Sequence, residues 1–477
     1  MALTRILFWL GNTLVLMAGL MVFTALLATL VLETDEAVSL GIAAIVSSVL
    51  GGLLVLATQK TPARETNQDA LYFLLMFWVF VPAVGAIPYV FLGSTPTYFD
   101  AWFEAVSAFT TTGSSTLLPE AQSQSLLLWR SVLAAFGGVA SATLAVVILA
   151  SLNLAGTGVH RSMLFTLKKG ALFGRLVAIG RIVALLYCLI AVAGFVLMSA
   201  NGARPFDAFC LALSGVATAG LSPSSLPLAE YIGLRAAIVL AIVCLLGAAS
   251  VAAHWDVFRL RSFREIRQFF RNVEHRALLG ITIGLGLLGF GYTGFRHFTT
   301  VNLEAAFLVS SAGFDYNVIG LELLPPSVLI AVALVGGAAL STAGGLKLIR
   351  ALLLMRHMRI DIERLSHPSR IKPVKFRGRH IADASFMSVW MYFLGYSLVF
   401  GIGIIVLATL GLPFDVAVPA AAGALANVGP LLDANMVLLG WEDFSRAQLL
   451  ASALLMIIGK VEVLAILAVL TSAMGKA

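Results

Sequence analysis

Long apolar runs dominate the pattern of hydrophobic and polar positions along this chain, and short polar stretches separate them. Ten of these runs are long enough to cross a bilayer as helices. Their approximate limits are Ile6–Leu32, Val38–Ala57, Leu71–Leu92, Leu126–Leu152, Val177–Ala200, Ile232–Ala253, Ala277–Phe295, Val328–Met355, Ser385–Leu410 and Ala447–Leu470. The pattern therefore predicts an all-α membrane protein with about ten transmembrane helices.

A segment between the third and fourth runs is too short and too polar to cross the membrane. A helix over Phe99–Phe109 would be about 16 Å long, half of a hydrocarbon thickness of about 30 Å. It is followed by Thr110-Thr111-Thr112-Gly113, which is rich in hydroxyl and carbonyl oxygens and ends on a residue that tolerates unusual backbone angles. Irregular backbone occurs at membrane depth only where it lines a wet cavity or is buried in protein. We interpret the segment as a re-entrant pore loop.

The chain contains four such loops, and their spacing reveals an internal repeat. Asp100 precedes Gly113 by 13 residues, and Asp207 precedes Gly220 by the same number. The loop ends are Thr-Thr-Thr-Gly (110–113), Ala-Thr-Ala-Gly (217–220), Ser-Ser-Ala-Gly (310–313) and Ala-Asn-Val-Gly (426–429). Each loop lies between two spans, so the repeated unit is helix, pore loop, helix. The predicted division is two extra N-terminal helices in 1–62, then repeats at 63–160, 161–262, 263–370 and 371–477.

Four units in the same orientation predict a central pore with pseudo-fourfold symmetry, with the loops meeting at its axis. Backbone carbonyls from the loops would replace the water shell of a dehydrated monovalent cation without any formal charge. The predicted filter for a monovalent cation comprises Thr111, Thr112, Gly113, Thr218, Ala219, Gly220, Ser311, Ala312, Gly313, Asn427, Val428 and Gly429. The absence of carboxylates among these residues argues against divalent selectivity.

Composition and charge narrow the class of protein further. Apolar residues make up 60% of the 477 residues and charged residues only 12%, with a mean hydropathy of +0.98. If the N-terminus is cytoplasmic, most of the 31 Lys and Arg residues lie on the cytoplasmic side, as the positive-inside rule requires. The exceptions are Lys460, within the membrane, and five residues on the outer side: Arg130, Arg204, Arg235, Arg296 and Arg446. The net charge of +7 is therefore a signal of membrane topology and does not indicate nucleic-acid binding.

Motifs for enzymatic chemistry are absent from the sequence. The cysteines (Cys188, Cys210 and Cys244) have no metal or redox spacing, and no histidines are paired at helical ligand spacing. The sequence contains neither a glycine-rich nucleotide motif nor a set of nucleophile and base. We expect a protein that is not an enzyme and has no cofactor of its own.

Two further features are compatible with a gate. Within Val328–Met355, the pairs Gly336-Gly337 and Gly344-Gly345 flank the small polar residues Ser341 and Thr342. Glycines packed against neighbouring helices are the alternative reading. Lys460 lies deep in the last predicted span, where a charge is costly and implies a function. It could instead extend toward the cytoplasm or pair with a neighbouring helix.

The motifs together resemble the Trk/Ktr/HKT superfamily of potassium and sodium transporters, most closely its bacterial TrkH type. The resemblance rests on the run at 100–113, Phe-Gly-Gly at 136–138, Ser-Thr-Ala-Gly-Gly-Leu-Lys at 341–347, Leu-Ser-His-Pro at 365–368, Asn-Val-Gly-Pro at 427–430 and Gly-Lys-Val-Glu at 459–462. The second and third loops depart from the usual family pattern at Ala219, Leu221 and Ala312. Glycine in all four loops accompanies preference for potassium over sodium in this family.

The resemblance implies potassium uptake across the bacterial inner membrane, with potassium as the substrate. It also implies an intramembrane gating loop at 336–345 below the filter, with Lys460 in the pathway beneath it. By the same resemblance, the protein would form a homodimer, surrounded by membrane lipid, on a cytosolic nucleotide-binding (TrkA-like) regulatory subunit. The alternatives are a sodium-permeable or proton- or sodium-coupled symporter of the same architecture, a membrane-embedded enzyme, and a non-conducting scaffold.

Overall fold

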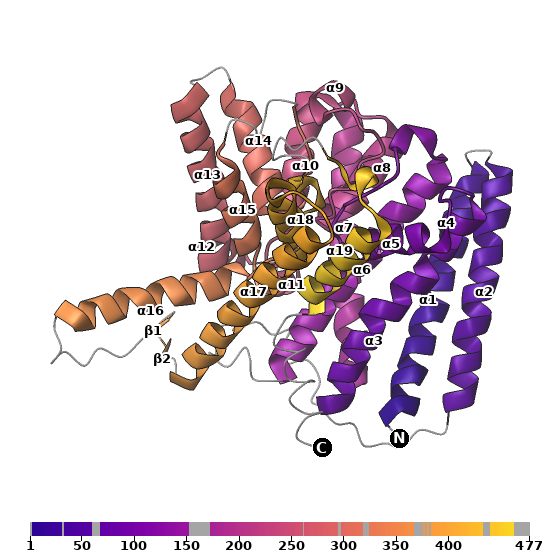
Figure 1. The fold of residues 1–477 in the computed structure, drawn as a ribbon, viewed down its shortest axis with the longest axis horizontal. Coiled ribbons are helices and arrows are strands. Elements are labelled where there is room, and N and C mark those ends of the chain that lie inside the picture. The colour runs from indigo at the N-terminus through magenta and orange to yellow at the C-terminus, as the bar shows by residue number, and fades with distance from the viewer. Residues whose placement is uncertain are drawn as a thin grey trace.

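The structure is a computed structural model, and it describes residues 2–30, 33–59, 67–151, 172–260, 262–293, 297–317, 324–366, 375–376, 379–380, 383–432 and 439–461. Helices provide nearly all of the regular structure in these ranges (Figure 1). The exception is a small hairpin in which β1 (Lys375–Phe376) pairs antiparallel with β2 (Arg379–His380). The expectation of an all-helical membrane protein is confirmed at this level.

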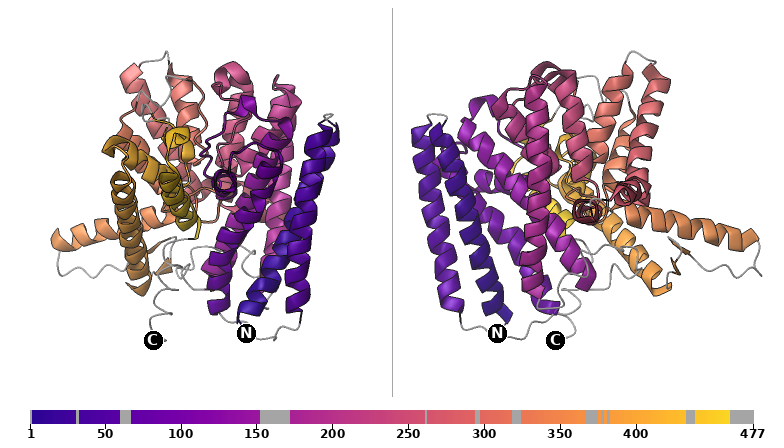
Figure 2. Two further views of the ribbon diagram at one scale, coloured as in Figure 1. Left: turned by 45° about the vertical axis from the view of Figure 1, so that its right-hand side comes forward. Right: turned by 180° about the vertical axis from the view of Figure 1, so that it is seen from behind.

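The first two helices pack against each other at one edge of the molecule (Figures 1 and 2). Helices α1 (Ala2–Leu30) and α2 (Thr34–Thr58) pack closely where Gly11 faces Gly51. A Cβ added at Gly11 would lie only 2.8 Å from the Gly51 carbonyl oxygen. Because neither residue has a side chain, the two helix backbones can approach each other closely.

The helices in the rest of the described chain are grouped here by the four predicted repeats in which they fall. The first repeat contains α3 (Asn67–Gly85), α4 (Ile87–Phe91), α5 (Tyr98–Phe109), the 3-10 turn η1 (Pro119–Ala121) and α6 (Gln124–Ser151). The second contains α7 (Leu172–Ala200), α8 (Pro205–Val216), α9 (Leu228–Tyr231), α10 (Gly233–Gly247) and α11 (Val251–Leu260). The third contains α12 (Phe263–Arg271), α13 (Val273–Thr293), α14 (Phe298–Val309), α15 (Pro326–Val335) and α16 (Leu348–Ser366). The fourth contains α17 (Asp383–Thr409), α18 (Phe414–Ala426), the 3-10 turns η5 (Gly429–Leu431) and η7 (Trp441–Asp443), and α19 (Arg446–Val461).

The short helices α5, α8, α14 and α18 are 12, 12, 12 and 13 residues long. Helix α5 begins after Thr97, whose hydroxyl accepts a hydrogen bond from the Asp100 N–H, and α8 begins with Pro205 in its first turn. The end of α5 is fixed by aromatic packing, because the Phe109 ring lies 5.0 Å from Trp78 and 5.6 Å from Phe136 between ring centroids. The predicted short helix over Phe99–Phe109 is confirmed.

Seven helices in the described residues are long and apolar enough to span a membrane, and an eighth is obtained if the bent pair α10–α11 is one span. The predicted span Val328–Met355 is interrupted, because α15 ends at Val335 and α16 begins only at Leu348. Of the last predicted span, only the part up to Val461 is described. The number of ten spans therefore stays a prediction.

The expectation of one continuous helix over Ile232–Ala253 is wrong. Helices α10 and α11 meet at an angle of 98°. Backbone groups at the bend have partners outside the helix: the Ala248 carbonyl accepts from Ala338 N–H at 3.0 Å, and Val251 N–H donates to Leu340 at 2.8 Å. These long-range hydrogen bonds replace helical ones, which explains the break.

Candidate ion-conduction site

The four predicted loops share one unusual backbone conformation two residues before each predicted filter glycine. The φ angle is 51° at Thr111, 54° at Thr218, 62° at Ser311 and 54° at Asn427. Residues other than glycine seldom adopt such left-handed angles. Four occurrences at matched positions therefore show that the repeat seen in the sequence is also a repeat in backbone structure.

The predicted filter glycines also have positive φ angles in three loops, but not in the fourth. The φ angle is 84° at Gly113, 70° at Gly220 and 68° at Gly313. In the fourth loop, Gly429 instead begins the 3-10 turn η5, with Pro430 as its second residue. The four copies are thus similar in backbone conformation but not identical.

Contacts between the loops define a closed order. An added Cβ at Gly113 would fall well inside 3.0 Å of the Ala219 carbonyl oxygen, and one at Gly220 would do the same at Ala312. At Gly313 the nearest atom is in Val428, at 3.2 Å. The ring closes between loops four and one. There, an added Cβ at Gly429 would overlap Ser114, and the Gly429 N–H donates to the Thr112 carbonyl at 2.6 Å. Loops one and three are therefore opposite each other, as are loops two and four.

Two buried carboxylates support the opposite loops one and three. Glu104 of α5 accepts hydrogen bonds from the Thr116 N–H at 2.6 Å and the Ser115 hydroxyl at 3.0 Å. Glu304 of α14 accepts from the N–H groups of Tyr316 at 2.7 Å and Asn317 at 3.1 Å. Both glutamates lie nine residues before a filter glycine, so the sequence contained this signal without revealing its role.

Loops two and four are held by other groups, which the sequence analysis did not identify. The Ser214 hydroxyl accepts a hydrogen bond from the Leu221 N–H at 2.9 Å. The Trp441 indole N–H donates to the Gly429 carbonyl at 3.2 Å. Trp441 lies 12 residues beyond Gly429, in a segment without a repeat signature, so only the folded structure reveals this contact. The ring is therefore supported in two different ways around its circumference.

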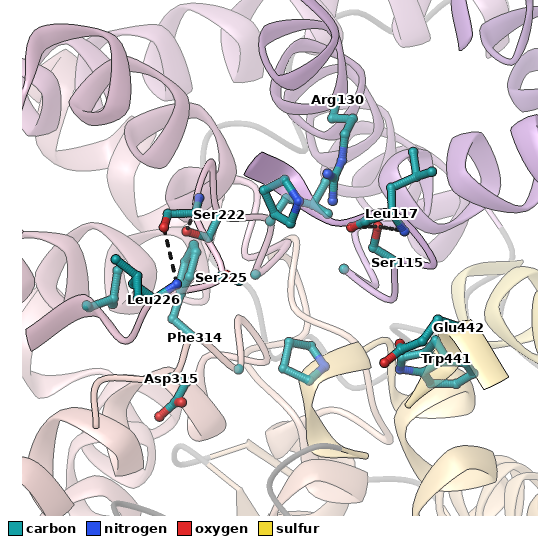
Figure 3. Close-up of a pocket in the computed structure, with 18 residues that line it drawn as sticks. Ser115, Leu117, Arg130, Ser222, Ser225, Leu226, Phe314, Asp315, Trp441 and Glu442 are labelled. Carbon is teal, nitrogen blue, oxygen red and sulfur yellow. Dashed lines mark hydrogen bonds between the residues drawn. The ribbon is translucent and has the colours of Figure 1, made fainter. Parts of the chain in front are cut away.

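A cavity of about 220 Å³ lies beside the predicted filter glycines (Figure 3). Gly113, Gly220 and Gly313 all line it, together with the charged residues Arg130 and Glu442. The cavity is thus bounded by three of the four loops at their predicted filter glycines.

A hydrogen-bond link joins the first two repeats beside this cavity. Glu120 in η1 accepts hydrogen bonds from the Ser225 N–H at 2.7 Å and from the hydroxyls of Ser224 and Ser225. Burial opposes ionisation of Glu120, but the hydrogen bonds outweigh it and hold the pKa of this carboxyl below its usual value. The link is therefore strongest when Glu120 is ionised.

The segment predicted as a gating loop lies directly against the loop ring. All residues from Gly336 to Ile349 are buried. The base of the segment is closed by hydrogen bonds from Leu346 N–H to the Leu334 carbonyl at 2.8 Å and from Lys347 N–H to the Val335 carbonyl at 2.9 Å. The segment is therefore an ordered excursion between α15 and α16 and not part of a continuous helix.

Its apex contacts the second and third loops of the ring. The hydroxyls of Thr342 and Thr218 are 3.0 Å apart, and Gly344 N–H donates to the Ser311 hydroxyl at 3.1 Å. Thr218 and Ser311 are two of the left-handed residues described above. The segment thus touches the ring at positions that the sequence assigned to the filter.

Lys460 contacts this segment, and the sequence analysis assigned both to the predicted gate. Its ammonium donates to the Thr342 carbonyl at 2.7 Å. A second lysine, Lys347, donates to the carbonyls of Ser341, at 3.4 Å, and of Ala343. Three consecutive carbonyls of the segment therefore each accept a hydrogen bond from a lysine Nζ.

Glycines bring helices α6, α10 and α19 against the short helices α5, α8 and α18. An added Cβ at Gly137, Gly247 or Gly459 would overlap the carbonyl oxygen of Phe109, Val216 or Leu425, respectively. Each of these carbonyls belongs to the residue four positions before a filter glycine.

The residue that follows each of these glycines contacts the gating segment. Gly138 lies close to Thr342, because a Cβ added at Gly138 would be 3.2 Å from the Thr342 methyl group. Ala248 accepts a hydrogen bond from Ala338 N–H, and Lys460 donates to Thr342. The segment is therefore contacted at matched positions from α6, from the end of α10 and from α19.

The fold and site together define an all-helical membrane protein in which four short helices lead into loops that meet in a ring. A family model described as "TrkH: Cation transport protein" matches residues 38–475. The chain belongs to this family of transport proteins, which are not enzymes, and the resemblance inferred from the motifs is confirmed.

Individual relatives agree with this assignment. The chain is 27% identical to the Trk system potassium uptake protein TrkH of Salmonella typhimurium over 98% of each chain. It is 28% identical to the Trk system potassium uptake protein TrkG of Escherichia coli over 80% of each. The fold matches the crystal structure of the potassium transporter TrkH from Vibrio parahaemolyticus with a TM-score of 0.88, at 24% identity and covering 98% of both chains.

Proposed function

We propose that this protein takes up potassium ions across the bacterial inner membrane through a pathway between the four loops. In this proposal ten spans, with the N-terminus cytoplasmic, surround a pseudo-fourfold axis. The closed ring of loops, with a left-handed residue at four matched positions, is the observation that carries the proposal. The names of the relatives support potassium as the transported ion.

Backbone carbonyls would select the ion. The filter would comprise residues 111–113, 218–220, 311–313 and 427–429. Ala219 and Ala312 depart from the usual family pattern only in their side chains, so they would still contribute carbonyl oxygens. Buried Glu104 and Glu304 would hold two opposite loops in place, which limits the movement of those carbonyls.

The segment 336–347 would close the pathway beneath the filter. Its hydrogen bonds to Thr218 and Ser311 place it against the ring, and the ammonium of Lys460 holds its apex. A positive charge at this point would also repel a cation that leaves the filter. Opening would require these hydrogen bonds to break, so a partner that pulls the segment away could control flux.

The proposed partners follow from the family resemblance. They are a second copy of the chain and a cytosolic nucleotide-binding (TrkA-like) regulatory subunit, with membrane lipid around the dimer. Potassium enters the proposal as a substrate and not as a cofactor.

Growth of a potassium-uptake-deficient bacterium at low potassium tests the proposal in a cell. The parent gene should restore growth, and a Gly220→Ala variant at equal membrane abundance should restore it poorly, because its Cβ would overlap Ala312. Gly233→Ala is the matched control, because Gly233 also has a positive φ of 75° but has open space around it. Failure of the parent gene to support growth, with the protein present in the membrane, would contradict potassium uptake.

A further inference from the structure

Helix α12 has an exposed surface divided into two adjoining strips. Phe263, Ile266 and Phe270 recur at intervals of three and four residues, so they share one strip. Their exposed fractions are 85%, 42% and 60%, respectively. This exposure is high for large apolar side chains, and it is concentrated in a helix of nine residues.

The second strip is basic. Arg264, Arg267 and Arg271 follow the same three- and four-residue spacing one position further along the helix, and all three are exposed. The arginine strip therefore lies directly beside the apolar strip. The opposite side of α12 faces the protein, where the Phe269 ring packs 4.2 Å from the ring of His275.

Chain connectivity places α12 at the end of a membrane span. Only Asn272 separates Arg271 from Val273, where the apolar helix α13 begins. The short helix α14 follows the other end of α13, so α12 lies at the end of α13 away from the entry of the third loop. A helix joined to a span by one residue cannot move far from the membrane surface.

Hydrogen bonds connect α12 to the gating segment through two adjacent residues of α13. The Nε2 atom of His275 accepts from Ser250 N–H at 3.0 Å, so its Nδ1 carries the proton and donates to the Phe269 carbonyl at 2.9 Å. Ser250 lies at the α10–α11 bend, and the next residue, Val251, donates to Leu340 of the gating segment at 2.8 Å.

The second connection is direct. The buried carboxylate of Glu274 accepts a hydrogen bond from Ala339 N–H at 2.8 Å. The gating segment is therefore tied both to the α10–α11 bend and to the first turn of α13. A displacement of α12 would be transmitted to residues 339 and 340 through these contacts.

We propose that α12 is an interfacial helix that binds the acidic headgroups of the inner leaflet, and that this binding stabilises the gating segment in its closed position. The proposal rests on the gating role inferred above for residues 336–347. Apolar side chains would enter the acyl boundary while the neighbouring arginines contact lipid phosphates. Because the segment is closed against the ring with α12 in this position, whatever holds α12 here favours closure.

A membrane surface fits α12 better than a soluble partner does. Both strips are continuous along the helix, and the covalent link to α13 keeps them at the membrane boundary. A surface for a cytosolic protein would instead remain in water when the protein is placed in lipid alone. The location of α12 in vesicles therefore distinguishes the two possibilities.

Fluorescence measures this location without relying on transport. Cys188 is the exposed native cysteine, so a Cys188→Ser background allows labelling at Ile266→Cys or, as a matched control, at Gln268→Cys on the arginine side of the helix. Vesicles contain phosphatidylcholine with increasing fractions of phosphatidylglycerol. An environment-sensitive label at residue 266 should shift to an apolar signal as phosphatidylglycerol increases, and a label at 268 should change less. A label at 266 that remains in water in all vesicles would overturn the proposal.

Potassium flux in the same vesicles tests the coupling to the gate. Phosphatidylglycerol should lower flux in the parent, and the double variant Arg264→Gln and Arg267→Gln should lose this response. The attraction of one arginine to an acidic surface corresponds to a change in flux of about fivefold. The response of flux to phosphatidylglycerol that the two arginines provide together is therefore up to about 30-fold. The variant Arg264→Lys and Arg267→Lys keeps the charges and should keep the response.

The outcomes separate this proposal from the proposed function. Flux that is present but independent of phosphatidylglycerol would overturn the lipid coupling and leave potassium transport intact. An absence of flux in every vesicle would instead count against potassium transport, and the fluorescence result would still decide whether α12 binds the membrane.

Discussion

A methyl group at Gly113 should weaken discrimination between potassium and sodium. Gly113 has a φ of 84°, a left-handed angle that costs a residue with a side chain about 1 to 2 kcal/mol. The added Cβ would also approach the Ala219 carbonyl oxygen about 1 Å closer than the 3.0 Å that real Cβ atoms keep. Relieving such an overlap within a packed interior costs about 1 to 3 kcal/mol.

The overlap acts on a predicted filter carbonyl, so its relief must move an atom that would contact the ion. A change of about 1.4 kcal/mol in relative binding alters a ratio tenfold. We therefore expect Gly113→Ala to reduce the potassium-to-sodium flux ratio by about tenfold or more. The assay is ion flux into vesicles, normalised to folded protein and measured separately for the two ions.

Gly93→Ala is the matched control for this experiment. Gly93 has a φ of 65°, and an added Cβ would meet no atom within 4 Å. This variant has the same kind of backbone cost without the overlap, so its flux ratio should equal that of the parent. An unchanged ratio in well-folded Gly113→Ala would refute the placement of Gly113 in the filter.

Three further predictions concern the ring and the gating segment. Gly313→Ala should reduce the potassium-to-sodium flux ratio less than Gly220→Ala does, because an added Cβ at Gly313 would lie 3.2 Å from Val428 and would not overlap any atom. Equal losses in the two variants would show that these contacts do not set selectivity. Deleting residues 338–342 should raise flux, because the deletion removes the apex of the gating segment and leaves its base, where Leu346 and Lys347 are hydrogen-bonded to the end of α15. Lower flux at normal protein levels would instead support a packing role for the glycines of this segment. Lys460→Ala should raise flux about tenfold or more, since a hydrogen bond from a charged group is worth about 1.5 to 3 kcal/mol. The flux of Lys460→Arg should stay near that of the parent. If the flux per folded molecule of Lys460→Ala equals that of the parent, the contact with Thr342 does not hold the gate closed.

Local sequence signals predicted the short helices and the positions of the loops well. Helix α5 spans Tyr98–Phe109, against a predicted Phe99–Phe109, because its cap at Thr97 and its end before Thr110 are encoded by neighbouring residues. The interruption at Gly336 was left open by the local sequence, because its glycines could equally have packed against neighbouring helices, and only the family resemblance implied a loop. Its glycine has a φ of 70°, and such residues disfavour a continuous helix.

Features that depend on distant residues could not be predicted in this way. The bend between α10 and α11 arises from hydrogen bonds to Ala338 and Leu340, about 90 positions later in the chain. Nothing in the apolar run over Ile232–Ala253 indicates these partners. The support of Gly429 by Trp441 and the contact of Lys460 with Thr342 are likewise products of folding. Sequence spacing revealed which residues are equivalent, but only the folded chain shows which of them are neighbours.

The reversal potential of the purified protein in a bilayer, with a potassium gradient opposed by an equal and opposite sodium gradient, shows most directly which ion the pathway selects. We predict a potential close to the potassium equilibrium value, because four loops contribute carbonyls to one ring. A reversal potential near zero, or one that favours sodium, would contradict a potassium-selective pathway between these loops.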